Sequence, residues 1–137
     1  MSCENQTYFP LSFSQLNIWN LECAFSGTSI NNISTTVRIK GQLNLNLLQE
    51  SIHHLLMSDR SLRTQLTIID GQVMQYQPDY VPEDFPVYDF CSTNPAGFEN
   101  WEIAVTRERM PLEKSPLYRF YLFRDSENSG GVLVKLH

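Results

Sequence analysis

The adjacent histidines His53 and His54 are the first residues in this sequence whose type suggests chemistry. Imidazole is a common metal ligand, but two histidines that hold one metal from a helix need i and i+4 spacing to share a face. Neighbouring residues on a helix point about 100° apart. We therefore expect His53 and His54 to lie on a solvent-facing side or a flank of a helix.

The other reactive residue types stand in unfavourable surroundings. Glu83 and Asp84 resemble a pair of catalytic carboxylates, but they lie in a proline-rich stretch that is typical of a solvated loop. The serines lie outside any G-x-S-x-G motif, and the run Ser129-Gly130-Gly131 fits a turn better than a phosphate-binding loop. The isolated residues therefore predict neither hydrolysis nor nucleotide binding.

Composition limits the class of protein further. The 137 residues suit one domain, and the scattered charges with a formal net charge of −5 argue against a nucleic-acid partner. No apolar run approaches the ~20 residues of a membrane span, and the polar N-terminus lacks the features of a secretory signal. The three cysteines are widely spaced and form no C-x-x-C pair, so we expect a reducing, cytoplasmic setting.

Periodicity and turn residues predict the elements that position these groups. Apolar spacings of three and four over residues 43–59 predict an amphipathic helix, and Asp70-Gly71 between two β-prone runs predicts a hairpin. In chain order we expect a helix from Ser12 or Ser14 to Glu22, a strand at 33–39, the helix at 43–59, strands at 62–69 and 73–77, a loop at 78–86, a short strand at 87–90, a helix from 94 or 95 to 109, and strands at 117–123 and 132–137. This order predicts an α/β fold with a mixed, largely antiparallel sheet flanked by helices.

The last seven residues are apolar and β-prone, and no turn, helix or polar tail follows them. Natural domains rarely stop in this way. We therefore expect residues 1–137 to be the first part of something longer.

Three segments together resemble one family, the condensation domains of nonribosomal peptide synthetases. The stretch from Leu11 to Leu21 is similar to the first core motif, S-x-A-Q-x-R-L-W-x-L, with Ser14 in place of its Ala and Asn17 in place of its Arg. Leu62-Arg63-Thr64 is similar to the end of the second motif, R-H-E-x-L-R-T, whose first half is replaced by Ser58, Asp59 and Arg60. Pro111-Leu112-Glu113 with Ser115-Pro116-Leu117-Tyr118-Arg119 resembles the stretch P-F-D-L-x-x-G-P-L-x-R.

The resemblance extends to the last residue. In the family a strand delivers the motif H-H-x-x-x-D-G, and residues 132–137 look like that strand with His137 as the first histidine. The second histidine, which the family uses to orient or deprotonate the attacking amine, would lie beyond the chain. The resemblance therefore implies residues 1–137 as the N-terminal subdomain of a chloramphenicol acetyltransferase-like fold, with the C-terminal subdomain missing and no catalytic residue or bound cofactor in the chain itself.

Two residues are implied to support the site. The resemblance pairs Arg63 with the aspartate of H-H-x-x-x-D-G; without that partner, we expect Arg63 to be hydrated, paired with another acid, or satisfied by another chain, with an exposed edge-strand arginine as the alternative. The implied role of His137 is structural, but as the terminal residue we expect it to be disordered. Gln15 and Trp19 are expected to serve helix-surface hydrogen bonding and core packing.

The function implied by the resemblance is amide-bond formation between an acyl or peptidyl thioester and an aminoacyl thioester, each held on the phosphopantetheine of a carrier domain. The fragment alone is expected to be inactive. Two alternatives stay open: a non-catalytic module that binds a carrier domain, and half of a related coenzyme A-dependent acyltransferase. The implied partners are carrier domains and the missing subdomain, without nucleic acid or membrane, and exposed apolar surface leaves self-association open.

Overall fold

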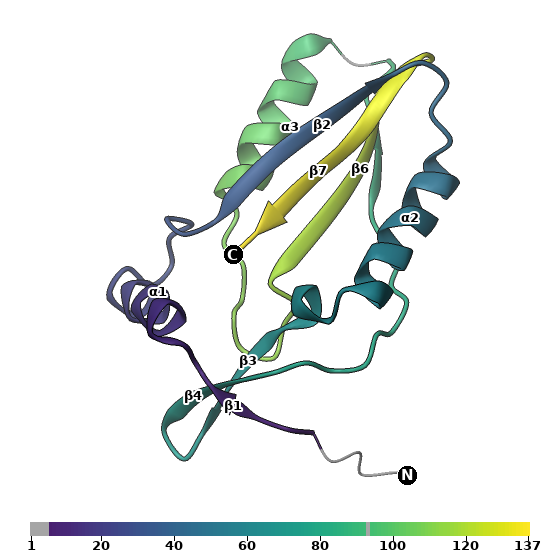
Figure 1. Ribbon diagram of the computed structural model, residues 1–137. Coiled ribbons are helices and arrows are strands. Elements are labelled where there is room, and N and C mark those ends of the chain that lie inside the picture. Colours follow the sequence, from purple (N-terminus) through teal and green to yellow (C-terminus); the bar gives the residue numbers. More distant parts are fainter. Residues whose placement is uncertain (1–5, 93) are drawn as a thin grey trace.

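The computed structural model describes residues 6–92 and 94–137 (Figure 1). The elements are β1 (Phe9–Pro10), α1 (Phe13–Ala24), β2 (Ile33–Lys40), α2 (Leu45–Ser58), a 3-10 turn (Arg60–Arg63), β3 (Gln65–Ile69), β4 (Gln72–Tyr76), β5 (Val87–Asp89), α3 (Pro95–Arg107), β6 (Tyr118–Ser126) and β7 (Ser129–Leu136). The predicted helices and strands all form in the predicted order, and β1 and the 3-10 turn are additional elements that the sequence analysis did not predict.

The main sheet has the strand order β2-β7-β6-β5. Its pairs are antiparallel except for the parallel pair of β5 and β6. Because side chains alternate along a strand, the register places Val37, Val132 and Leu122 on one face, and Leu133 and Tyr121 on the other. Helices α2 and α3 lie on either side of this sheet (Figure 1).

The face toward α2 carries the hydrophobic core. The spacing of Ile52 and Leu56 on α2 places both against the strands, and the 78–86 loop adds Phe85. The buried members of this cluster are Ile52, Leu56, Phe85, Tyr118, Phe120, Leu122 and Val132. The predicted amphipathic helix thus packs Ile52 and Leu56 against the core, with Leu45 and Leu48 partly buried, whereas Leu55 is exposed.

The face toward α3 is packed with aromatic rings. Phe98 of α3 lies 4.9 Å from Phe123 of β6 between ring centroids, and Trp101 lies 5.0 Å from Tyr88 of β5. Glu102 of α3 accepts a hydrogen bond from Thr36 of β2. These contacts fix α3 across the sheet, with its last turn over β7.

A second sheet of order β1-β4-β3 packs at the N-terminal end of the molecule. The predicted hairpin forms at Asp70 and Gly71, whose positive φ angles of 49° and 79° are those of a tight turn. Helix α1 joins this sheet through Gln15, whose Nε2 donates to Gln75 at 2.9 Å. Ser12 caps α1 together with Gln15, which confirms Ser12 rather than Ser14 as the start.

Several predicted boundaries were wrong. Leu62 and Arg63 belong to the 3-10 turn rather than to the following strand, because the Asp59 side chain accepts from Ser61 and holds that turn. The run Ser129-Gly130-Gly131, which was predicted as a turn, forms the first three residues of β7 instead. A Cβ at Gly131 would lie 1.9 Å from the Val37 carbonyl oxygen, so the close approach of β2 requires glycine here. Helix α3 ends at Arg107 rather than at 109.

The two histidines on α2 diverge as expected. His53 lies on the flank of the helix, where Nδ1 contacts the hydroxyl of Tyr80, and its ring lies 5.0 Å from that of Phe85. His54 is exposed. Among residues 6–92 and 94–137, no helix has the length and apolar character needed to span a membrane.

Candidate functional site

Strand β7 delivers His137 to a buried position next to α1. The His137 backbone N–H donates to the Leu117 carbonyl at 3.0 Å, which continues the pairing of β7 with β6. Its side chain is only 7% exposed. The expectation that His137 is disordered was therefore wrong, because the residue extends an ordered strand and packs against a second element.

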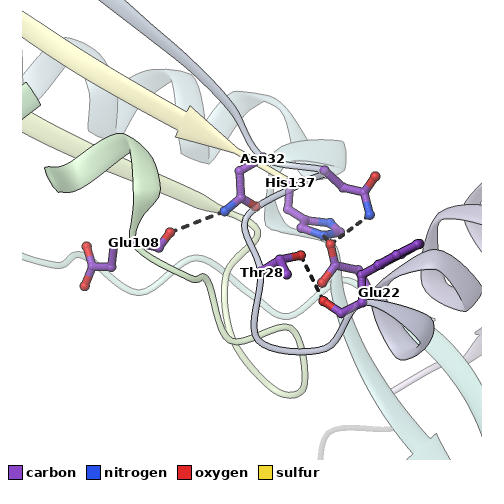
Figure 2. Close-up of polar contacts among 7 residues, drawn as sticks. Glu22, Thr28, Asn32, Glu108 and His137 are labelled. Carbon is purple, nitrogen blue, oxygen red and sulfur yellow. Dashed lines mark hydrogen bonds and ion pairs between the residues drawn. The ribbon is translucent and has the colours of Figure 1, made fainter. Parts of the chain in front are cut away.

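The partner of His137 is Glu22 of α1 (Figure 2). His137 Nε2 lies 3.1 Å from Glu22 Oε1, and the Glu22 side chain is 8% exposed. The same oxygen accepts a hydrogen bond from Asn31 Nδ2 at 2.8 Å. No hydrogen bond forms between Nε2 and the carboxylate in this structure, so the pair is a close, buried contact between two ionisable side chains.

The segment between α1 and β2 closes over this pair (Figure 2). Thr28 Oγ1 donates to the Phe25 carbonyl at 2.9 Å, and Asn32 Nδ2 donates to the Glu108 carbonyl at 3.4 Å. These hydrogen bonds tie the segment to the end of α1 and to the end of α3. They hold Asn31 in the position from which it reaches Glu22.

Glu22 is the residue of this candidate site that the sequence analysis did not single out. Helix α1 is apolar on several sides, and Glu22 is its buried residue. The available signal was its spacing, since Glu22 follows Trp19 by three positions and therefore shares a helix face with it. A carboxylate on that face requires a polar partner if it is buried.

A hollow of about 470 Å³ lies beside the pair, between α1 and the segment before β6. Trp19 is half-buried and lines it, so its expected role in packing is met only in part. The Lys114 backbone N–H donates to the Leu66 carbonyl at 2.7 Å, which fixes the segment 111–119 against β3. The residues around the hollow are Trp19, Glu22, Cys23, Ser26, Arg109, Pro111, Leu112 and Glu113.

Arg63 is buried, with 7% of its surface exposed. Its Nη1 donates to the carbonyls of Leu56 at 2.6 Å and Met57 at 2.9 Å, and its Nε donates to Pro78 at 3.1 Å. The alternative of an exposed edge-strand arginine was wrong. Backbone carbonyls of the same chain, which the other expectations did not include, accept three of its hydrogen bonds, two at the C-terminal end of α2 and one at Pro78 in the following loop.

The structure does not bring Arg63 and His137 into contact. The hydrogen bonds of Arg63 lie within α2 and the 78–86 loop, whereas His137 contacts Leu117 and Glu22. Arg63 instead lines a second hollow of about 310 Å³ with Glu83 and Tyr118. Tyr118 donates to Glu83 at 2.8 Å, and burial together with this carboxylate raises the pKa of the Tyr118 phenol.

Lys135 of β7 is a second buried cation, 1% exposed, that the sequence did not reveal. Its Nζ donates to the carbonyl of Val105 at 2.8 Å and to that of Glu108, both at the C-terminal end of α3. Burial lowers the pKa of Lys135. This contact fixes α3 to β7 two residues before His137.

Known proteins are similar to this chain in sequence and in fold. The family model for the condensation domain matches residues 5–137. The chain belongs to the condensation domain family. Among relatives, it is 26% identical to surfactin synthase subunit 1 of Bacillus subtilis (strain 168) over 96% of this chain, and 27% identical to bacitracin synthase 2 of Bacillus licheniformis over 98%.

Solved condensation domains share the fold. The starter condensation domain of rhizomide synthetase RzmA superposes with a TM-score of 0.87 at 20% identity, covering 96% of this chain and 32% of that one. The first condensation domain of the CDA synthetase gives 0.83 at 13% identity, covering 96% and 35%. The expected chloramphenicol acetyltransferase-like α/β fold is therefore confirmed. The chain spans 4% and 5% of the length of the surfactin and bacitracin synthases and about a third of these solved chains.

Proposed function

We propose that residues 1–137 form the N-terminal subdomain of a condensation domain that makes amide bonds in nonribosomal peptide synthesis. The donor would be an acyl or peptidyl thioester and the acceptor an aminoacyl thioester, each on the phosphopantetheine of a carrier domain. The observation that carries this proposal is the buried placement of His137 at the end of β7, where the resemblance has the first motif histidine.

Catalysis of this kind depends mainly on positioning. Two tethered substrates that meet in a channel react as if in one molecule, which can contribute about 7–11 kcal/mol in well-aligned cases. The second motif histidine would orient the amine or accept its proton, an effect of about 10²–10⁴-fold. Residues 1–137 provide one wall of such a channel and the first histidine, so the chain alone is proposed to be inactive.

Arg63 is proposed to hold the H-H-x-x-x-D-G motif in place. Its three hydrogen bonds use Nε and Nη1, and Nη2 takes part in none of them. We propose that Nη2 receives the aspartate of H-H-x-x-x-D-G, which would hold that motif in shape. The helix carbonyls support this role because they fix the guanidinium plane before the carboxylate binds.

The proposed partners are carrier domains and a C-terminal subdomain. The proposed setting is the cytoplasm, which the unpaired thiols of Cys23 and Cys91 support. No cofactor is proposed for the chain itself, since the phosphopantetheine arms belong to the carrier domains.

A condensation assay tests this function. Donor-loaded and acceptor-loaded carrier domains are mixed with residues 1–137 alone, and with the same residues joined to the remainder of a condensation domain. We expect amide product, detected by mass spectrometry, only from the joined form, with loss of product when the second motif histidine is replaced by alanine. Product from residues 1–137 alone would contradict the proposal.

A second version of the assay, with a different donor, tests the alternative of a coenzyme A-dependent acyltransferase. A structure of a double mutant of the RzmA starter condensation domain is a complex with C8-CoA, so this coenzyme A derivative binds to this fold in that protein. Replacing the donor carrier by C8-CoA distinguishes the two donors, since a carrier-dependent enzyme gives product only in the first arm. Carrier binding without product in either arm would favour a non-catalytic module.

A further inference from the structure

The contact between Glu22 and His137 joins two buried ionisable side chains from elements 115 positions apart in sequence. A buried carboxylate is costly unless it is hydrogen-bonded and paired. Asn31 meets part of that requirement, and the His137 imidazole lies at 3.1 Å from the same oxygen. The two partners therefore converge on one oxygen of Glu22.

We propose that Glu22 is a positioning residue that holds the His137 ring with Nε2 turned toward α1. The role of this contact in condensation rests on the function proposed above, but the contact itself does not. A carboxylate beside a neutral imidazole favours the tautomer whose proton faces the carboxylate. Glu22 would therefore fix both the orientation of the ring and the proton on Nε2.

The surroundings of Glu22 support a fixed position. Asn31 donates to Oε1, and its own segment is tied down through Thr28 and Asn32 (Figure 2). Glu22 is therefore oriented independently of His137. A carboxylate that is held in advance can order a second side chain at a smaller entropic cost than a mobile one.

The contact with Glu22 also affects the backbone at His137. His137 is anchored on one side by the Leu117 carbonyl and on the other by the ring contact with Glu22. These two anchors together define the direction in which the chain leaves β7. Glu22 would thus set the placement of the residue after the first motif histidine without touching substrate.

The test reads the imidazole proton directly. Two-bond ¹H–¹⁵N spectra of the ¹⁵N-histidine-labelled chain, at a pH where imidazoles are neutral, report whether Nδ1 or Nε2 carries it. His137 is assigned by the loss of its signals in His137→Gln, and the exposed His54 is the internal reference for a free ring. In the wild type we expect one set of His137 signals with the proton on Nε2.

Two substitutions of matched shape separate the acceptor from the packing. Glu22→Gln keeps an acceptor oxygen and should retain the Nε2–H signature, whereas Glu22→Met keeps the shape but lacks a strong acceptor. In Glu22→Met we expect loss of the single tautomer and averaging like that of His54. Glu50→Met, an exposed change on α2, is the control and should leave His137 unchanged.

Two results would overturn the proposal. One is a wild-type His137 with its proton on Nδ1, which decides the question even if no variant folds. The other is a folded Glu22→Met whose His137 signals match the wild type. Neither result bears on the condensation assay, so failure of the positioning role and failure of the proposed function are distinguishable.

Discussion

A buried cation donates hydrogen bonds to the C-terminal end of each of the two helices that flank the main sheet, α2 and α3, and the two sites differ. Arg63 donates to Leu56 and Met57 at the end of α2 and also to Pro78. Lys135 donates to Val105 and Glu108 at the end of α3. In both places carbonyls at the C-terminal end of a helix accept from a positive charge that the helix dipole favours.

The two cations differ in whether a donor atom stays available for a further group. Arg63 lines an open hollow and keeps Nη2 outside its hydrogen bonds, whereas Lys135 is enclosed between α3 and β7. The planar guanidinium donates to a helix and to a loop through nitrogens held in one plane, whereas the ammonium of Lys135 donates to two carbonyls at one helix end. The α2 end is therefore suited to receive another group, and the α3 end is a closed structural contact.

The largest expected effect is at Arg63. Arg63→Met keeps a long apolar stem but removes three hydrogen bonds from a charged donor, so we expect the free energy of unfolding to fall by about 3 kcal/mol. Urea unfolding followed by circular dichroism measures the loss. Arg60→Met in the same turn is exposed and should change it by less than about 0.5 kcal/mol. Equal losses at Arg60 and Arg63 would remove the special status of the α2 end.

The same replacement at Lys135 should cost less. Lys135→Met removes one donor from each of two carbonyls, which keep the donors Asn32 Nδ2 and Glu108 N–H, and it also removes a charge whose burial is unfavourable, as the lowered pKa indicates. We expect a loss of about 1–2 kcal/mol in the same urea experiment. Lys40→Met on the exposed end of β2 is the matched control. A loss larger than that of Arg63→Met would reverse the comparison.

The sequence predicted the elements around these cations better than their contacts. Apolar spacing on residues 45–58 and the Asp70-Gly71 turn are local signals, and both elements formed. The acceptors of Arg63 are backbone carbonyls. Every residue has a carbonyl, so the residue types in the sequence do not indicate which ones accept. The partner of His137 lies on α1, and only the closing of β7 against β6 and β2 brings Glu22 to it.

The opposite ends of the two helices give a smaller effect. Asn44 and Asn94 cap α2 and α3, accepting from Leu47 at 3.1 Å and Gly97 at 3.0 Å. Asn44→Ala and Asn94→Ala should each lower the free energy of unfolding by about 1 kcal/mol. If the helix ends are independent, Asn44→Ala adds to Arg63→Met within about 0.5 kcal/mol in a double variant, and a larger departure would show that they are coupled.

The smallest expected effect is a difference between the two cations in how the free energy of unfolding depends on pH. Burial lowers the pKa of Lys135 below its ordinary value of 10.5, so in the folded state it releases its proton at lower pH than in the unfolded state. The unfolded state then binds more protons between the two values, and the free energy of unfolding rises with pH in that window. Tyr118 and Tyr121 act in the opposite sense, because burial raises the pKa of both phenols, to about 12 for Tyr121. Their contribution is intact below the unfolded value of 10.0 and is lost as pH rises through the folded value.

The pKa of the Cys91 thiol is also raised, from 9.0, mainly by its hydrogen bond with Asp89. Urea midpoints measured from neutral pH up to pH 9.0 stay below the ordinary pKa values of this thiol and of the two phenols, so a rise in that range reports the lysine. We expect a rise in the wild type and in Arg63→Met, since arginine stays charged throughout, and no rise in Lys135→Met. A rise that persists in Lys135→Met would assign the titration to another group and leave the α3 end electrostatically equivalent to the α2 end.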